Sequence, residues 1–230
     1  MNDDLLARLI EKVESRFYGK YRAFVVDNAD PEDRGRLKLK VPGVLNDEVF
    51  TGWAMPCVPY GGAVDQGFLF IPEVDAGVWV EFEAGNLDYP IWVGTYWGKP
   101  GGSSEVPKPN QPDGTEDSAV QNPPTRKIIK TVKGHTIQFE DADDDELVMI
   151  WEATNKNLVV MNKDGITVTD GANQQGIVLD NKGIKLTDKT GNIIEMSDSA
   201  FTITSKVAFD IKAEGQAVTI TGSTVDFKKG

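Results

Sequence analysis

Few side chains in this chain of 230 residues have the types and spacing that catalysis requires. Glu81 and Glu83 could serve as the carboxylate pair of a glycoside hydrolase. They alternate with Val80 and Phe82 in a strand pattern, which would place both carboxylates on one side of a sheet. A solvated sheet face explains the pair more simply. The sequence therefore predicts no enzyme and no catalytic residue, and a cell-wall hydrolase stays only as an alternative.

An acidic turn further along the chain has part of the pattern of a calcium loop. Asp141, Asp143, Asp145 and Glu152 match four ligand positions of such a loop. Glu146, however, occupies the position that requires glycine, and the flanking residues have strand patterns. We therefore predict no metal and no cofactor, with calcium as the alternative.

The chain has one histidine and one cysteine. His135 has no second histidine and no nucleophile motif to act with, so a structural or surface role is expected. Cys57 lies in the apolar stretch WAMPCVPY, which favours a small core residue over a nucleophile. A single cysteine also excludes an internal disulfide framework.

A strand pattern rich in basic residues could indicate nucleic-acid binding. Alternating basic residues together with three tryptophans could form the groove of a single-stranded nucleic-acid-binding protein. The other interpretation is a solvated strand that pairs with acidic neighbours, with the aromatics in the core. The net charge of -12 disfavours phosphate binding, so no nucleic-acid partner is predicted. The residues concerned are Arg34, Arg36, Lys38, Lys40, Trp79, Trp92 and Trp97.

Residues 1–17 predict a short amphipathic helix. Its apolar stripe would dock either on its own domain or on another protein. The N-terminus is acidic and no apolar run reaches about 18 residues, so we expect synthesis in the cytosol without a signal peptide or membrane span. The stripe consists of Leu5, Leu6, Leu9, Ile10 and Val13.

Residues 18–98 have β patterns throughout. Five short strands, read from YRAFVV, RLKLKV, GFLFIPE, GVWVEFE and PIWVGTYWG, predict a small barrel of the OB type. Residues 99–125 are rich in Pro, Gly, Ser and acidic residues, which is typical of an extended linker. The fold class is therefore all-β, with an OB-fold barrel after a short helix.

Residues 126–230 carry a repeat of one short strand and one turn. KIIKTVKGHTIQFED and ELVMIWEA predict two strands around the acidic turn, and corresponding strands then open at Gly165, Gly183, Ala200 and Ala217. Further strands are predicted between these positions, the last of them at residues 207–211 and 225–227. Units of eight or nine residues indicate a stacked β architecture.

The apolar side of this repeat must be covered either by the same chain, coiled into a solenoid, or by copies of the chain that wind together. Each strand offers two or three apolar side chains, and no nearby helix pattern would bury them. A unit of one strand suits three chains that each contribute one wall of a triangular prism. We therefore predict an intertwined homotrimer, a triple-stranded β-helix. Its inward residues would be Ile166, Val168, Ile177, Leu179, Ile184, Leu186, Phe201, Ile203, Val218 and Ile220.

The residues quoted above also carry a resemblance. YGKYRAFVVDNADPEDRGRLKLKVPGVL, the pairing of PEVDAGVWVEFE with YPIWVG, and the following TRKIIKTVKGHTIQFED resemble the central spike family of contractile injection machines. That family includes the baseplate assembly protein V of phage tails and the VgrG spike of type VI secretion. The resemblance covers about residues 18–230.

The resemblance implies a mechanical protein. A trimer would attach below the hub protein of a baseplate, and its β-prism would be driven through a target envelope by the tube and sheath. The N-terminal stripe is then a candidate contact to the hub. The only histidine, His135, lies far from the C-terminal end, so we expect no iron tip held by histidines. We expect instead that a separate PAAR-type tip protein binds at the C-terminal end of the shaft.

Overall fold

The computed structural model describes residues 6, 9, 10, 13, 15–46, 48–117 and 124–228. They divide into two compact units, Met1–Val106 and Pro107–Gly230. In the predicted N-terminal helix, Leu6, Leu9, Ile10 and Val13 have helical backbone and exposed side chains, whereas Leu5 lies outside the described residues. Among the residues described, no helix is long and apolar enough to cross a bilayer.

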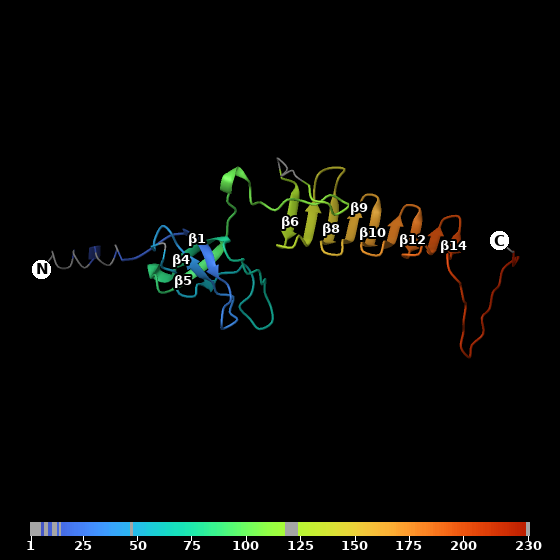
Figure 1. Cartoon of the computed structure of the whole chain (residues 1–230), viewed down its shortest axis with the longest axis horizontal. Helices are drawn as coiled ribbons and strands as arrows, with labels where there is room; N and C mark the ends of the chain where they lie inside the picture. Colours follow the sequence, from blue (N-terminus) through green and yellow to red (C-terminus); the bar gives the residue numbers. More distant parts are fainter. Residues whose placement is uncertain are drawn as a thin grey trace. The chain divides into compact units, whose positions relative to one another are not determined.

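The first unit is built on one five-stranded sheet. Its strands are β1 (Tyr21–Asp27), β2 (Lys38–Lys40), β3 (Met55–Pro56), β4 (Gly77–Phe82) and β5 (Pro90–Thr95), in the order β2-β1-β4-β5-β3. All pairs are antiparallel except β3 with β5. Two short 3-10 helices, η1 (Glu83–Gly85) and η2 (Pro100–Gly102), follow β4 and β5 (Figure 1).

Alternating side chains of these strands close around one core. In β4, Val78, Val80 and Phe82 point inward and are buried, and in β1 Ala23 and Val25 do the same. Bridges from Leu37 to Ala54 and from Lys40 to Phe50 bend the sheet further around this core. The predicted all-β, OB-like first domain is confirmed as such a half-barrel sheet. The other members of the core are Leu37, Leu39, Val41, Ala54 and Trp92.

Three predictions for this unit are wrong. GFLFIPE forms no strand, and Phe68, Leu69 and Phe70 are exposed. Cys57 is exposed and is not a core residue. Of the three tryptophans named above, Trp92 alone is in the core, where its Nε1 donates to the Gly35 carbonyl at 3.1 Å. The apolar composition predicted that these side chains are buried. Cys57 and the residues of GFLFIPE instead follow β3, and Trp79 lies on the outer side of the sheet.

A buried carboxylate organises the turn between β1 and β2. The Asp30 side chain accepts hydrogen bonds from the backbone N–H groups of Glu32, Arg34 and Arg36, and it accepts two more from the Arg36 guanidinium, the shorter at 2.6 Å. The Arg36 side chain, above all, holds the pKa of Asp30 well below its usual range. The ionised form is therefore the one that the folded turn requires.

We expect Asp30→Asn to weaken the first unit and to flatten its acid response. Because the pKa of Asp30 is depressed by folding, its stabilisation is complete above the unfolded value of about 3.9 and is lost as the pH falls towards the folded value. Tryptophan-monitored melting from pH 7 down to pH 2 measures this loss. Glu32→Gln, at a 58% exposed side chain, is the control, and equal pH slopes for Asp30→Asn and the wild type would contradict the assignment.

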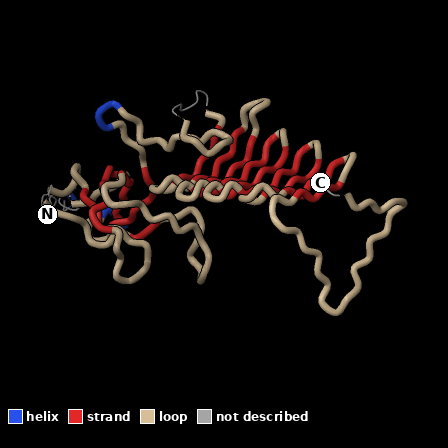
Figure 2. The backbone as a smooth tube through the Cα atoms, turned by 45° about the vertical axis from the view of Figure 1, so that its right-hand side comes forward, coloured by secondary structure: helices blue, strands red, loops and turns tan. Residues whose placement is uncertain are grey.

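The second unit is a ladder of nine antiparallel strands in sequence order (Figure 2). Each strand pairs with the one before and the one after it, through turns of two to six residues. The strands are β6 (Arg126–Lys130), β7 (Thr136–Glu140), β8 (Leu147–Glu152), β9 (Asn157–Asn162), β10 (Gly165–Asp170), β11 (Gln175–Asp180), β12 (Gly183–Thr187), β13 (Ile193–Ser197) and β14 (Phe201–Thr204).

The ladder differs from the prediction at both ends. KIIKTVKGHTIQFED is two strands, β6 and β7, because Thr131 and His135 close a tight turn within it, and β9 was not predicted at all. The strands predicted at residues 207–211, 217–220 and 225–227 do not form within one chain. Val218 and Ile220 accordingly lie outside the ladder and are exposed.

Part of the predicted linker, residues 107–117, lies on one face of the first strands, and we call it the strap. The Asn110 backbone N–H donates to Gln138 Oε1 at 2.8 Å, and Gln138 Nε2 donates to the Asn110 carbonyl at 2.9 Å. Arg126 binds Asp117 at 2.9 Å. The strap covers the face on which Met149 and Val160 are buried, so the first four strands have a small core of their own.

Gln138→Ala should release the strap. The buried N–H and C=O of Asn110 would lose both partners, which costs about 2 to 4 kcal/mol in the free energy of unfolding. Hydrogen exchange of residues 107–117 should accelerate and the denaturation midpoint should fall. Lys108→Ala, which removes an ion pair to Glu116 between half-exposed side chains, is the control and should leave the exchange of the strap nearly unchanged.

Candidate functional site: an open apolar face

One face of the ladder is apolar from β7 to β14, and in β6 it carries Ile129 beside Lys127. Residues directly opposite in antiparallel strands share a face, and Ile166, for example, lies opposite Met161 on one side and Leu179 on the other. The same register extends through all nine strands. The apolar face consists of Ile129, Ile137, Phe139, Val148, Ile150, Val159, Met161, Ile166, Val168, Ile177, Leu179, Ile184, Leu186, Ile194, Met196, Phe201 and Ile203.

The apolar face has no cover within the described residues. Ile166 is 39% exposed, Leu179 37% and Phe201 63%, although each stands between apolar neighbours. The opposite face is different: from β10 onward it is mostly polar, with Thr167, Lys185, Glu195 and Thr202, and its apolar side chains are Val178 and Ile193. The exposed apolar area is therefore continuous and one-sided, and such an area marks an interface in a folded protein.

Eight of the ten predicted core residues share this face. They are the residues of β10, β11, β12 and β14, and they include the pair Ile184 and Leu186. Val218 and Ile220 are not brought to it. The structure adds strands β6 to β9 to the face, which the prediction left out although Ile137, Phe139 and Ile150 have the same alternation.

The apolar face is also hollowed towards its C-terminal end. An open hollow of about 600 Å³ runs across β10 to β14, lined on its floor by Val168, Ile177, Leu186 and Ile203 and at its end by Val207 and Phe209. The lining also includes Asp170, Asp188 and Ser205, whose side chains are hydrogen-bonded to Asn173, Asn192 and the Val207 carbonyl.

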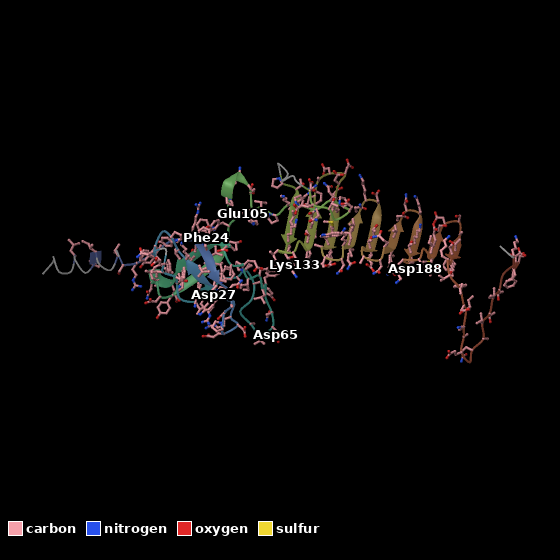
Figure 3. All side chains as sticks on the ribbon, in the orientation of Figure 1. Phe24, Asp27, Asp65, Glu105, Lys133 and Asp188 are labelled. Atoms are coloured by element: carbon pink, nitrogen blue, oxygen red, sulfur yellow. The ribbon has the colours of Figure 1, made fainter. Side chains whose placement is uncertain are left out.

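Repeated polar clamps, which sequence reasoning missed, hold one edge of the ladder. A carboxylate at the end of β8, at the end of β10 and directly after β12 accepts a hydrogen bond from a side-chain amide four or five residues later. The pairs are Glu152 with Asn157, Asp170 with Gln175 and Asp188 with Asn192, at 3.4, 3.4 and 2.7 Å. Figure 3 shows Asp188 at the same edge as Lys133 of the first turn. The spacing of 18 between the three carboxylates was visible in the sequence.

Two of these side-chain amides also bind the next turn on that edge. Asn157 Oδ1 accepts from the backbone N–H of Gly171, and Asn192 Oδ1 accepts from that of Lys206 at 2.7 Å. The Thr190 hydroxyl, above all, lowers the pKa of Asp188 to about 2, so its carboxylate stays ionised. These turns are thus fixed to one another, and the ladder keeps a constant geometry.

The residues considered for catalysis or metal binding are used otherwise. Glu81 pairs with Lys20 at 2.6 Å, and Glu83 does not lie on β4 but in η1. His135 Nδ1 accepts from the backbone N–H of Ala153 at 3.2 Å, which is a structural role. Glu152 lies at the end of β8 opposite to the acidic turn, so it cannot complete a calcium loop with Asp141.

No group of three or more histidine, cysteine or acidic side chains within the described ranges is arranged to hold a metal ion.

The charged side chains of the basic strand are paired with acidic neighbours. Arg36 binds Asp30, Arg34 binds Glu32 at 3.2 Å, and Lys38 lies 4.0 Å from Asp27. Trp79 and the buried Trp92 stand on opposite faces of the sheet and cannot line one groove. These contacts agree with the interpretation of the basic residues as a strand that pairs with acidic neighbours.

The two units define a class of protein: an OB-like half-barrel joined to a long antiparallel strand ladder. Residues 21–97 match the family model of the type VI secretion system/phage-baseplate injector OB domain. The match spans all five strands of the first unit, from the first residue of β1 to beyond β5. The predicted resemblance is thereby confirmed for these residues, which are similar to the OB domain of baseplate injectors. No curated protein matches the chain.

Proposed function

We propose that this chain is the central spike of a contractile injection system or phage tail, a homotrimer that pierces a target envelope mechanically. The observation that carries the proposal is the apolar face, which runs along nine strands of a chain whose first unit matches an injector OB domain. A monomer would leave this face in water, whereas three copies that turn it towards one axis bury it.

The trimer makes a shaft out of ladders that a single chain leaves half open. Ile166, Leu179 and Ile184 of each copy face their counterparts across the axis, and the polar face with Thr167 and Lys185 stays in water. The work of such a protein is displacement of a membrane, so it needs no catalytic group, metal or cofactor.

The partners follow from the same proposal. The apolar stripe that includes Leu6, Leu9, Ile10 and Val13 is exposed and is proposed to bind the hub protein of the baseplate. A PAAR-type tip protein is proposed to close the shaft beyond residue 228, and the inner tube and sheath act on the spike through the hub. The spike is thus a component of the particle at its baseplate, and no nucleic acid is among its partners.

The mass in solution tests the proposal. Light scattering of the purified full chain should give about three times the 25.2 kDa of one chain, and this mass should be unchanged on dilution. The mass of a single chain would overturn the proposal. A stable dimer would overturn it as well, because two ladders face to face form a sandwich and not a shaft.

A further inference from the structure

Residues 58–70 form a hairpin that we call the arm. The backbone N–H of Phe68 donates to the Tyr60 carbonyl at 3.1 Å, and a bridge joins Ala63 to Gln66. The Tyr60 hydroxyl donates to Gln66 Oε1 at 2.9 Å, and its ring meets that of Phe68 edge to face at 5.8 Å. The arm is therefore a built element and not a loose connection (Figure 1).

A glycine lets the two sides of the arm approach closely. A Cβ at Gly67 would lie 3.0 Å from the Tyr60 carbonyl oxygen, and its φ of +147° is in the region that favours glycine. The sequence thus specifies the hairpin itself, although the hairpin buries little of its own apolar surface.

The arm is apolar and exposed along its length. Val64 at the tip is 88% exposed and Leu69 81%, and Tyr60, Phe68 and Phe70 are each more than half exposed. Its single charged residue is Asp65, next to Val64, and this side chain makes no hydrogen bond or ion pair to any described residue. An exposed cluster of this kind in a protein that is 26% charged indicates a binding partner with an apolar surface.

The outer side of the same half-barrel carries such a surface, which we call the platform. Its members are Arg22 and Phe24 of β1, Trp79 of β4 and Tyr96 after β5. The Tyr96 ring lies 5.2 Å from that of Trp79 and 6.4 Å from that of Phe24. Gly77 makes room for it, because a Cβ there would lie 2.8 Å from the Tyr96 ring.

Arg22 gives the platform a cation, and burial, together with the nearby Glu105 carboxylate, raises the pKa of Tyr96 in spite of this cation. The Arg22 guanidinium carbon lies 5.7 Å from the Trp79 ring and 5.8 Å from the Tyr96 ring, and within the described ranges it forms no ion pair. The arm and the platform therefore match in chemistry: both carry exposed aromatic side chains, the arm has one anion, Asp65, and the platform has a cation, Arg22.

We propose that, in the trimer, the arm of each copy lies on the platform of the next copy, with Asp65 beside Arg22. The inference rests on the trimer of the proposed function. Within one unit Asp65 and Phe24 point to different sides (Figure 3), so the arm does not reach its own platform. A contact between two different patches of identical chains runs head to tail, and it closes into a ring when the shaft fixes the number of copies at three.

Disulfide trapping in the full chain tests the contact. In a Cys57→Ser background, which removes the single exposed thiol, Arg22→Cys and Asp65→Cys are combined and the protein is oxidised. A disulfide forms only between Cα atoms within about 7 Å. We expect a three-chain covalent band, at least tenfold above that of an Asp65→Cys and Glu48→Cys control pair and independent of dilution. Glu48 is exposed in the loop between β2 and β3.

The other outcomes separate this inference from the proposed function. A trimer by light scattering without the covalent band, or with a band that fades on dilution, overturns the arm contact alone; the arm then serves another partner. A disulfide within one chain overturns it too. A single-chain mass before oxidation overturns the trimer and the arm contact together. Phe24→Cys replaces Arg22→Cys if that variant does not reach the wild-type mass.

Discussion

Ile184→Asp is expected to convert the proposed trimer into separate chains. Ile184 lies between Leu179 and Met196 on the apolar face, so the change would place three carboxylates around one axis in a dry interface. Removing an unpaired carboxylate from water costs several kcal/mol for each ion, and their mutual repulsion adds to that cost. Light scattering should show the mass of one chain, while far-ultraviolet circular dichroism retains the β signal of the half-barrel.

Val178→Asp is the matched control for this change. Val178 is on the neighbouring strand but on the opposite face, where it lies across from Lys185, so a carboxylate there meets water and a cation. The mass of this variant should stay that of a trimer. Loss of the trimer in both variants would mean that any charge in these strands disrupts folding. An unchanged trimer in Ile184→Asp would mean that the apolar face is not the trimer core.

Gly183→Ala should have the second large effect, on the ladder itself. Gly183 opens β12 with a φ of +132°, and a Cβ there would lie 1.9 Å from the carbonyl oxygen of Met196 in the paired strand. The strands must separate or the turn must change, at a cost of about 3 kcal/mol or more in the free energy of unfolding. We expect a lower thermal midpoint and faster hydrogen exchange in β11 to β14.

Gly176→Ala in the adjacent strand separates this effect from a general intolerance of side chains. Gly176 has no positive φ, and its Cβ would lie 3.1 Å from the Val168 carbonyl, which a small shift relieves. Its cost should stay below about 1 kcal/mol. Equal melting of the two variants would contradict the role assigned to Gly183.

The register of the ladder was predictable, because alternation of period two places every second residue on one face. Ile166, Val168 and Ile184 were assigned to one face on that pattern alone, and the cross-strand pairs agree. At Val218 and Ile220 the same pattern predicts a strand that does not form within one chain, since alternation does not supply the neighbouring strand that must pair with it.

Other parts of the molecule depend on contacts that no local pattern encodes. Asn110 and Gln138 are 28 residues apart, and nothing in a segment rich in proline and glycine indicates that it will be bonded to a strand. The arm was mistaken for a strand of the barrel because Phe68 and Phe70 alternate in an apolar stretch. Composition predicted that these side chains are covered, whereas within the described residues they are exposed.

The stacking of the strands would give the proposed shaft a directional strength. Neighbouring strands lie about 4.8 Å apart, so the eight steps from β6 to β14 span roughly 38 Å, and the backbone hydrogen bonds run along that span. A compressive load in this direction pushes each strand against the next and is resisted by van der Waals contact. A tensile load opens the ladder one strand at a time from β14. A spike built in this way withstands a thrust far better than a pull, which suits a part that is driven forward once.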